Sequence, residues 1–214
     1  MAVEDGVVAR RMNLPDLLWV MAQHRYHFPD NVIGRLGRGL LARYYRTFLD
    51  SPFAVATVIE VAGERAGYLV GVLDTTTHRR LLWRSHGQSL AVAAAAAFLR
   101  HPALGAGIVV RRLQLRLRRQ PAETQAPAER IAVLSHVAVH PDHQGHRLGP
   151  LLVDQFLASC SAAGTDRACV ATADDAPRAA RMYLRRGFVL TGRSRTFDGR
   201  MIRLYERAMA KQAT

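Results

Sequence analysis

Apolar and polar positions follow two different periods along the N-terminal part of the chain. Apolar residues recur at a helical period after Asn13 and Pro15, a pair typical of a helix start, and again before Ser51 and Pro52, which end a helix. Between these stretches the residues HRYHFPDN are expected to form a loop, and the later AGER turn predicts a β-hairpin. The pattern predicts helices over residues 14–24 and 34–49 and strands over residues 3–10, 53–61 and 66–73.

Strands and helices also alternate in the C-terminal part of the chain. A strand with alternating valines ends at Pro141, and a helix follows it with apolar residues at Leu148, Leu151, Leu152 and Phe156. Further strands are expected over residues 168–172, 189–195 and 201–208, with a turn over residues 196–199.

A long segment, residues 75–128, separates these two parts. It is far longer than a typical connection and is expected to be an inserted subdomain, with helices over residues 78–100 and 104–119 and a linker over residues 121–127. It contains nine arginines and has no acidic residue before Glu123. We interpret residues 1–74 and 129–214 as one catalytic domain. The segment between them is a lid over the acceptor, a docking face for a carrier protein, a membrane-surface helix or a solvated helical hairpin.

The composition is typical of one globular unit. The chain has 214 residues and 49% hydrophobic content, enough to bury the core of one domain. Its first residues lack the pattern of a signal peptide, and its longest apolar run, residues 89–99, is too short to span a bilayer. We therefore expect a cytoplasmic protein without integral membrane association. Cys160 and Cys169 lie on a predicted helix and strand, which indicates packing rather than a disulfide or a metal site.

The charge balance is strongly basic, with a formal net charge of +13 and Lys211 as the only lysine. Such an arginine bias is typical of a GC-rich bacterial genome. A basic surface attracts anions such as the phosphates of coenzyme A, an acidic carrier protein, lipid or nucleic acid. The sequence has no basic motif with interleaved aromatic residues, so we do not expect a nucleic-acid partner.

The turn within HVAVHPDHQGHRLGPLLVDQFL, residues 136–157, carries the clearest functional signal. The first N–H groups of a helix have no partner within the helix, and the helix dipole adds positive potential there. Phosphate is the natural ligand of such a helix start. Gly145 and Gly149 allow the backbone to approach a ligand closely.

This turn resembles the acyl-CoA-binding turn of the GCN5-related N-acetyltransferase (GNAT) family, which reads Gln or Arg, two residues, Gly, one residue, Gly or Ala. Gln144 and Gly149 match that pattern. Arg147 takes the place of the inner glycine, and we expect a helical backbone there and a guanidinium that helps to hold phosphate. Pro150 is compatible with a first helical turn.

A second segment, APRAARMYLRRGF at residues 176–188, resembles the later motif of the same family. That motif reads Asn, two residues, Ala, two residues, an apolar residue, Tyr, three residues, Gly and Phe. The matching residues are Ala179, Met182, Tyr183, Gly187 and Phe188. Ala176 replaces the family's asparagine, so we expect Asp175 to cap the helix. The two motifs stand in the family's order, about one βαβ step apart, and the resemblance extends over residues 129–207.

The resemblance implies an α/β (α+β) fold: a mixed, mostly antiparallel central sheet flanked by helices, with a helical insertion between the third and fourth strands. It also implies an acyl donor, which is acetyl-CoA or another acyl-CoA, or an acyl phosphopantetheine on a carrier protein, and it implies no metal. The residues expected to bind the donor are Val137, Ala138, Val139, Gln144, Gly145, His146, Arg147, Leu148, Gly149, Pro150, Asp175, Ala179 and Met182.

Acyl transfer to an amine needs a base for the amine, donors for the carbonyl oxygen and an acid for the thiolate. In the resembling family a strand splays from its neighbour at a bulge, which corresponds to residues 134–137 here. His136 is the candidate base, because an imidazole pKa near ~6.5 suits proton transfer at neutral pH, and Ser135 is a candidate water ligand. The alternatives are a water chain as the base and a histidine bonded within the sheet. Tyr183 is the candidate acid, or a tyrosine that packs on the sheet.

The acceptor is expected to meet the loop between the first two helices, where the candidate residues are His24, Tyr26, His27 and Phe28. The alternative is a surface loop with an aromatic anchor. The leading interpretation is an N-acyltransferase that moves an acetyl or other short acyl group from a CoA thioester to a small-molecule amine. The alternatives are a carrier-protein-dependent acyltransferase, a protein N-acetyltransferase and a non-catalytic acyl-CoA-binding domain. We expect a monomer or a homodimer.

Overall fold

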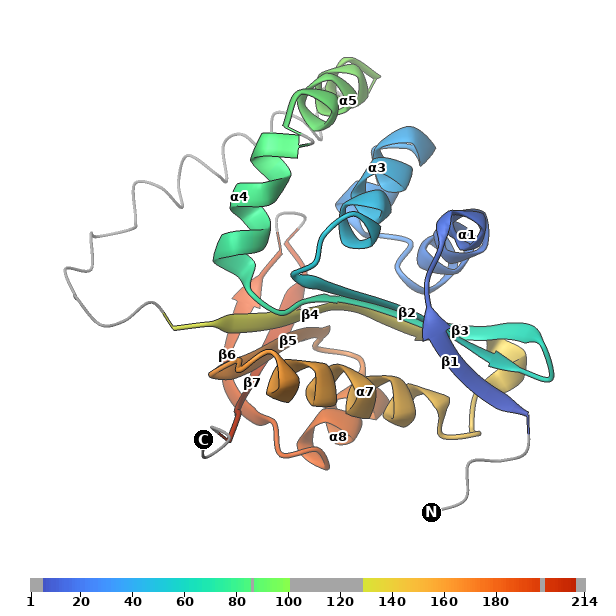
Figure 1. Ribbon diagram of the computed structural model, residues 1–214, viewed down its shortest axis with the longest axis vertical. Coiled ribbons are helices and arrows are strands. Elements are labelled where there is room, and N and C mark those ends of the chain that lie inside the picture. The colour runs from blue at the N-terminus through green and yellow to red at the C-terminus, as the bar shows by residue number, and fades with distance from the viewer. Residues whose placement is uncertain (1–5, 86, 101–128, 197–198, 211–214) are drawn as a thin grey trace.

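The computed structural model describes residues 6–85, 87–100, 129–196 and 199–210 (Figure 1). Its strands are β1 (Val7–Arg11), β2 (Ala54–Val61), β3 (Glu64–Val72), β4 (Ile131–Val139), β5 (Arg167–Ala173), β6 (Val189–Arg195) and β7 (Met201–Ala208). They form one sheet in the order β1-β2-β3-β4-β5-β7-β6. Neighbouring strands are antiparallel except β4 and β5, which are parallel. The expected mixed, mostly antiparallel sheet is confirmed.

Helices cover both faces of this sheet. They are η1 (Leu14–Asp16), α1 (Leu17–His27), α2 (Val32–Arg35), α3 (Arg38–Leu49), α4 (Thr75–Ser85), α5 (Gly87–Arg100), η2 (Pro141–His143), α7 (Leu148–Ala162) and α8 (Pro177–Leu184). Figure 1 shows α1, α3, α4 and α5 on one face of the sheet and α7 and α8 on the other. Each face has its own apolar core, with Leu152 and Phe156 under α7 and Leu41 and Tyr45 under α3. The strands and helices of the C-terminal part lie where the sequence predicts them, within two residues.

The N-terminal helices differ from the prediction in their bounds. Helix α1 continues through His27, so the expected loop is shorter and its first residues are helical. The helix ends there because Phe28 precedes a proline, and steric contact with a proline ring disfavours the helical conformation of the residue before it. The single helix expected over residues 34–49 is two helices, α2 and α3. They are interrupted at Gly37, whose φ of 109° a side chain would resist.

A buried carboxylate joins the start of α1 to the sheet. Asp16 is 0% exposed and pairs with Arg10 of β1 at 2.7 Å and with Arg65 of β3 at 2.7 Å. It also accepts the backbone N–H of Asn13 at 2.9 Å. These hydrogen bonds outweigh the cost of burial and hold the pKa of Asp16 well below its ordinary value. The first helix is therefore pinned to β1 and β3 by charge as well as by packing.

The described part of residues 75–128 consists of two helices rather than the one expected over residues 78–100. Helix α4 ends at Ser85, and α5 begins at Gly87 and packs beside α3. His78 anchors α4, because its Nδ1 lies 2.8 Å from the Ser51 hydroxyl and its ring lies 5.8 Å from that of Phe48. The helix expected over residues 104–119 and the linker over 121–127 lie outside the described residues. No helix in the described ranges is long and apolar enough to cross a membrane.

Candidate active site

Strands β4 and β5 separate half-way along β4. Their parallel pairing begins at Ile131 and stops at Leu134, although β4 continues to Val139. The register between β3 and β4 skips Ser135, so a β-bulge lies where the parallel strands separate. Beyond the bulge, the β5-facing edge of β4 has no strand partner in the described part of the chain. Its peptide groups can hydrogen-bond a ligand that adds alongside β4.

The bulge turns two consecutive side chains toward the face that carries α1 and α3. Ser135 shares a hydrogen bond with the hydroxyl of Tyr44 on α3. The His136 ring lies 5.7 Å from the ring of Tyr44 and 5.1 Å from that of Phe28. Alternating residues of a regular strand would point to opposite faces, so the bulge is what brings these two side chains together. Tyr44 is a residue of this candidate site that the apolar period of residues 34–49 does not single out.

Burial keeps the His136 imidazole neutral. Desolvation and the neighbouring His24 lower the pKa of His136 to about 3, which corrects the expectation of an ordinary histidine pKa at this position. Among the described residues, its ring packs against those of His24, Phe28, Tyr44 and Tyr45. At neutral pH His136 can accept a hydrogen bond, but it is a weak base.

His24 lies behind His136 in the core rather than in a loop. It is 0% exposed, and its ring meets the His136 ring edge to face at 4.7 Å. Its Nδ1 lies 2.8 Å from the Tyr45 hydroxyl, which lies 2.9 Å from the hydroxyl of Tyr68 on β3. Burial lowers the pKa of His24 to about 4. Helix α1 thus supplies a neutral imidazole that supports His136 from within.

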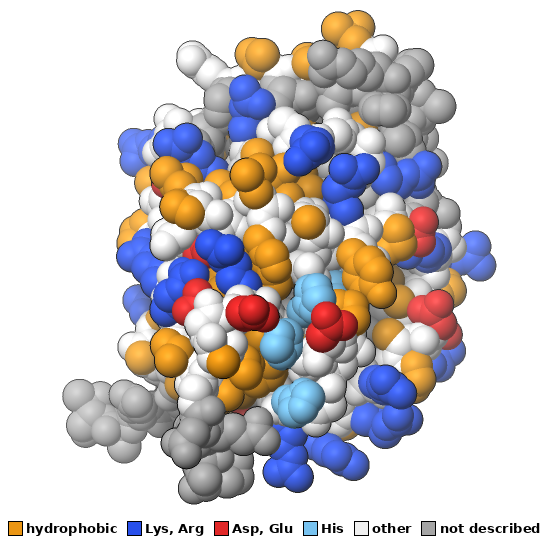
Figure 2. Space-filling view, turned by 90° about the vertical axis from the view of Figure 1, so that its right-hand side faces the viewer, with side chains coloured by type: hydrophobic (Ala, Val, Ile, Leu, Met, Phe, Trp, Pro, Cys, Tyr) orange, Lys and Arg blue, Asp and Glu red, His pale blue; other side chains and the backbone are white. Residues whose placement is uncertain are grey.

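The other three residues expected at the acceptor separate in space. Phe28 is half-buried beside His136, whereas Tyr26 is 66% exposed. His27 points toward the end of β4, where it hydrogen-bonds the backbone of Val139; burial and the nearby His140 lower the pKa of His27. Histidine side chains gather on this surface of the molecule (Figure 2), with the His140 and His143 rings 6.1 Å apart. Only Phe28 of these three therefore lies at the bulge.

The turn between β4 and α7 presents a row of free amides. Within the described part of the chain, the N–H groups of residues 145–149 have no hydrogen-bond acceptor. Gly145 has a φ of 91°, and the Gln144 side chain donates to the Val139 carbonyl at 3.3 Å. A Cβ at Gly149 would lie 3.6 Å from the sulfur of Met182 and 3.8 Å from the Val139 side chain. The turn, the end of β4 and α8 therefore meet at the start of α7, as a phosphate-binding turn requires.

Arg147 departs from the expected helical backbone. It precedes the first helical residue of α7 and adopts a left-handed conformation with φ 58° and ψ 15°. That conformation explains why the related pattern has glycine here, since a side chain in it costs roughly 1–2 kcal/mol. Pro150 occupies the third helical position and contributes no N–H to a bound anion.

Helix α8 places Tyr183 in the core beneath the sheet. Its side chain is 3% exposed and packs 5.6 Å from the Phe188 ring and 6.3 Å from the Tyr205 ring. Burial raises the pKa of Tyr183, so its phenol stays protonated at neutral pH. The expected cap is absent, because Ala176 is the N-cap and no side chain, Asp175 included, caps this helix. Pro177 starts the helix instead, since its ring presets the helical φ.

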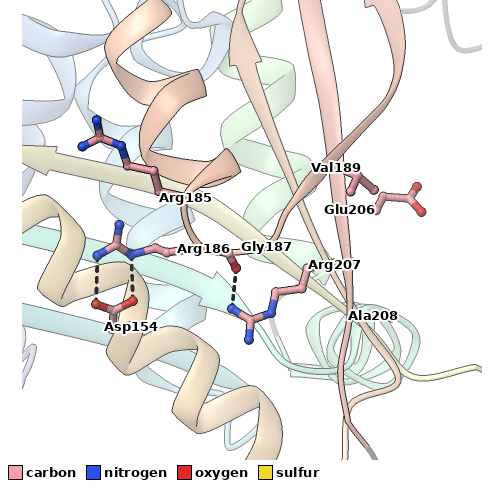
Figure 3. A pocket seen from close by; sticks show the side chains of 8 residues that line it. All are labelled: Asp154, Arg185, Arg186, Gly187, Val189, Glu206, Arg207 and Ala208. Atoms are coloured by element: carbon pink, nitrogen blue, oxygen red, sulfur yellow. Dashed lines mark hydrogen bonds and ion pairs between the residues drawn. The ribbon is translucent and has the colours of Figure 1, made fainter.

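A hollow of about 650 Å³ opens elsewhere, beside the end of α8 (Figure 3). It contains none of the residues predicted for the site. Arg186 pairs with Asp154 of α7 at 2.7 Å, and Arg207 donates to the Arg186 carbonyl. Arg207 pairs in register with Ala168, at the closed end of the sheet, so this hollow is separate from the opening beyond Leu134. The described residues also contain no group of acidic, histidine or cysteine side chains able to hold a metal ion.

The sequence matches the Acetyltransferase (GNAT) family over residues 35–188, more than half of the chain. The chain belongs to the GNAT acetyltransferase family. It is therefore an acyltransferase, and acyl transfer from acetyl-CoA is its family's reaction. Curated proteins gave no significant match to the sequence.

Solved structures share the fold at low sequence identity. The ribosomal-protein-S18-alanine N-acetyltransferase from Escherichia coli aligns with a TM-score of 0.59 and 12% identity over 97% of this chain and 96% of that one. The spermidine/spermine N-acetyltransferase SpeG from Vibrio cholerae aligns with a TM-score of 0.56 and 12% identity over 95% of both chains. The protein yncA from Salmonella typhimurium, with its cofactor acetyl-CoA, aligns with a TM-score of 0.58 and 14% identity over 98% of both chains. The named acceptors of two of these proteins differ in kind, so the shared fold does not identify the acceptor here.

Proposed function

We propose that this GNAT protein transfers an acetyl or other short acyl group from a CoA thioester to the amine of a small molecule. The observation that carries the proposal is the opening beyond Leu134, which joins the free edge of β4 to the amide row at the start of α7. One end of this continuous surface suits a thioester arm and the other end suits a diphosphate. When bound there, acetyl-CoA supplies the acyl thioester.

The donor is held by backbone groups. Residues Val137, Ala138 and Val139 offer peptide groups to the pantetheine arm as a neighbouring strand would. The amides of residues 145–149, with the positive end of the α7 dipole, meet the diphosphate, and the Arg147 guanidinium adds a charged contact. Ala179 and Met182 of α8 line the opposite side of the crevice. The five unpaired amides favour CoA over a carrier protein as the donor, because the phosphopantetheine arm of a carrier protein has one phosphate, whereas CoA has a diphosphate.

The reaction moves two protons, one from the acceptor nitrogen and one to the departing sulfur, and residues of this chain act on both. Ser135 and the neutral His136 orient the acceptor nitrogen, and His136 accepts a hydrogen bond from it or from a water that takes its proton. Tyr183 holds its proton at neutral pH, since burial raises its pKa, and donates it to the departing sulfur. Peptide N–H groups around Val137 polarise the carbonyl oxygen.

A small acceptor suits the described surroundings of the bulge. Asp30, in the loop after α1, pairs with Arg200 of the β6–β7 hairpin at 3.0 Å. This pair joins two segments far apart in the sequence, and we propose that it narrows the path an extended peptide would need. Under this proposal, residues 1–74 and 129–214 form a single domain, and residues 75–128 are an insertion into it. A cytoplasmic location and a monomer or homodimer stay predictions.

The test is binding of acetyl-CoA by calorimetry, followed by mass spectrometry of amine mixtures incubated with the protein and acetyl-CoA. We expect stoichiometric binding and one or more acetylated small amines. An acyl carrier protein loaded with acetyl phosphopantetheine is titrated in parallel, and preferential binding of that carrier would replace CoA as the donor. Binding of acetyl-CoA with no acyl transfer to small amines or peptides would instead indicate a binding domain without catalysis.

A further inference from the structure

The acceptor side of the bulge is walled by aromatic and uncharged polar side chains. Phe28, Tyr44, Ser135 and His136 are all partly exposed there, and the rings of Phe28 and Tyr44 flank the imidazole at 5.1 and 5.7 Å. The polar atoms among them are two hydroxyls and one imidazole. All three groups are neutral in the range where amines are ordinarily acylated, because burial raises the pKa of Tyr44 and lowers that of His136.

No carboxylate among the described residues contacts this wall. Of the acidic residues on the neighbouring loops, Asp30 pairs with Arg200 at 3.0 Å and Asp174 with Arg203 at 2.6 Å, and no carboxylate is among the groups that shift the pKa of His136 or Tyr44. The groups packed around His136 are His24 of α1 and Tyr44 and Tyr45 of α3, together with Phe28. None of them carries a negative charge at neutral pH. An ammonium group entering this site would lose its water and find no opposite charge among the described residues packed there.

The lowered pKa values of two imidazoles indicate that this environment disfavours a positive charge. Burial lowers the pKa of His136 to about 3 and that of His24 to about 4, so protonation of either ring is strongly disfavoured. An acceptor ammonium placed against the partly exposed His136 ring loses hydration for the same reason. The weak basicity of His136 adds a second difficulty, because removing the proton of a strongly basic amine needs a stronger base.

We propose that the acceptor is a weakly basic amine, already neutral at physiological pH, carried on an aromatic or other apolar body. This inference rests on the proposed acyl transfer. The neutral nitrogen attacks the thioester carbonyl carbon, a C–N bond forms, and the C–S bond breaks. One proton leaves the nitrogen and one proton ends on the sulfur, so the products are an amide and free CoA. Phe28 and Tyr44 receive the apolar body, and Ser135 and His136 receive the N–H groups.

The test compares two isomers, p-toluidine and benzylamine, as acceptors at neutral pH with acetyl-CoA saturating. They have the same atoms and an aromatic ring each, but p-toluidine is neutral and benzylamine is protonated. We expect kcat/KM to be larger for p-toluidine by about tenfold or more, since each pKa unit of penalty corresponds to a factor of ten. Equal or higher kcat/KM for benzylamine, or faster acetylation of spermidine or a lysine peptide, overturns the inference.

A matched pair of variants tests the cause. Ser135→Asp places a carboxylate beside the acceptor nitrogen, and Ser135→Asn has a similar shape without the charge. We expect the ratio of benzylamine to p-toluidine turnover to rise by about tenfold in Ser135→Asp relative to Ser135→Asn. An unchanged ratio contradicts the inference. The acceptor panel and calorimetry separate the two levels: transfer to spermidine or the lysine peptide without transfer to p-toluidine refutes the substrate class alone, whereas failure of the parent protein to bind acetyl-CoA, or to acylate any amine, refutes the proposed function.

Discussion

Replacing Arg147 by glycine should stabilise the fold and weaken donor binding at the same time. Arg147 has a left-handed backbone, φ 58° and ψ 15°, immediately before α7. A side chain in that conformation costs roughly 1–2 kcal/mol, and glycine avoids the cost. Glycine loses more freedom on folding, which offsets about 0.4–1 kcal/mol. The net gain is about 0.5–1 kcal/mol, or about 2 °C in the Tm of a chain of this length.

The effect on the donor has the opposite sign. A guanidinium that hydrogen-bonds a phosphate contributes about 1.5–3 kcal/mol, so Arg147→Gly should raise the Kd for acetyl-CoA roughly tenfold to a hundredfold. Arg147→Ala removes the same guanidinium but keeps a side chain on the left-handed backbone. It should match Arg147→Gly in Kd and unfold at a lower temperature.

Calorimetry gives the Kd, and thermal and urea unfolding give the stability. Arg185→Ala is the control for net charge, because Arg185 lines the hollow beside α8, away from the turn between β4 and α7. It should leave the Kd within about twofold of the parent value, as expected for a distant charge screened by salt. Acetyl-CoA binding by Arg147→Gly at parental strength would refute a phosphate contact by this guanidinium. Equal unfolding temperatures for the glycine and alanine variants would refute the cost of the left-handed backbone.

Three further predictions follow from buried groups. Tyr183→Phe should lower kcat about tenfold or more and leave the Kd for acetyl-CoA unchanged, as loss of a general acid does; an unchanged kcat would leave Tyr183 a packing residue only. With p-toluidine as acceptor, log kcat/KM should show no inflection near ~6.5, the ordinary histidine pKa, because the pKa of His136 is about 3; an inflection there would show that a histidine ionises during catalysis. Asp16→Asn should destabilise the fold by about 3 kcal/mol at pH 7, because it leaves two arginines without their buried partner. Asp50→Asn, at an exposed pair with Arg46, should cost less than about 0.5 kcal/mol in the same urea titration. The pKa of Asp16 is lower in the folded state than in the unfolded state. Its contribution to the free energy of unfolding is therefore complete above the unfolded-state pKa, and it is lost as the pH falls through the folded-state pKa. Equal unfolding free energies for the two variants would contradict the importance of the buried pair.

Residues of the candidate site differ in how visible they are in the sequence. Gly145, Gly149 and Met182 belong to two ordered motifs, because contact with a donor constrains local backbone and spacing. Tyr44 stands at a helical period with other apolar residues, and the period does not reveal where its hydroxyl points. His24 and Phe28 were expected together at the acceptor, yet one is interior and the other lies beside His136.

The sequence by itself determined the order of the elements, the C-terminal strands, the two-part family motif and the glycine-containing turn before α7. These depend on hydrophobic period, proline and glycine positions and short-range backbone hydrogen bonds, all of which act within a few residues. Only the tertiary structure decided that β4 bulges at Ser135 and leaves β5 after Leu134, and that α1 runs on to His27. It also decided that His136 is neutral and that Arg147 is left-handed. Strand register, desolvation and the direction of a chain entering a helix depend on partners distant in sequence, and no local pattern contains them.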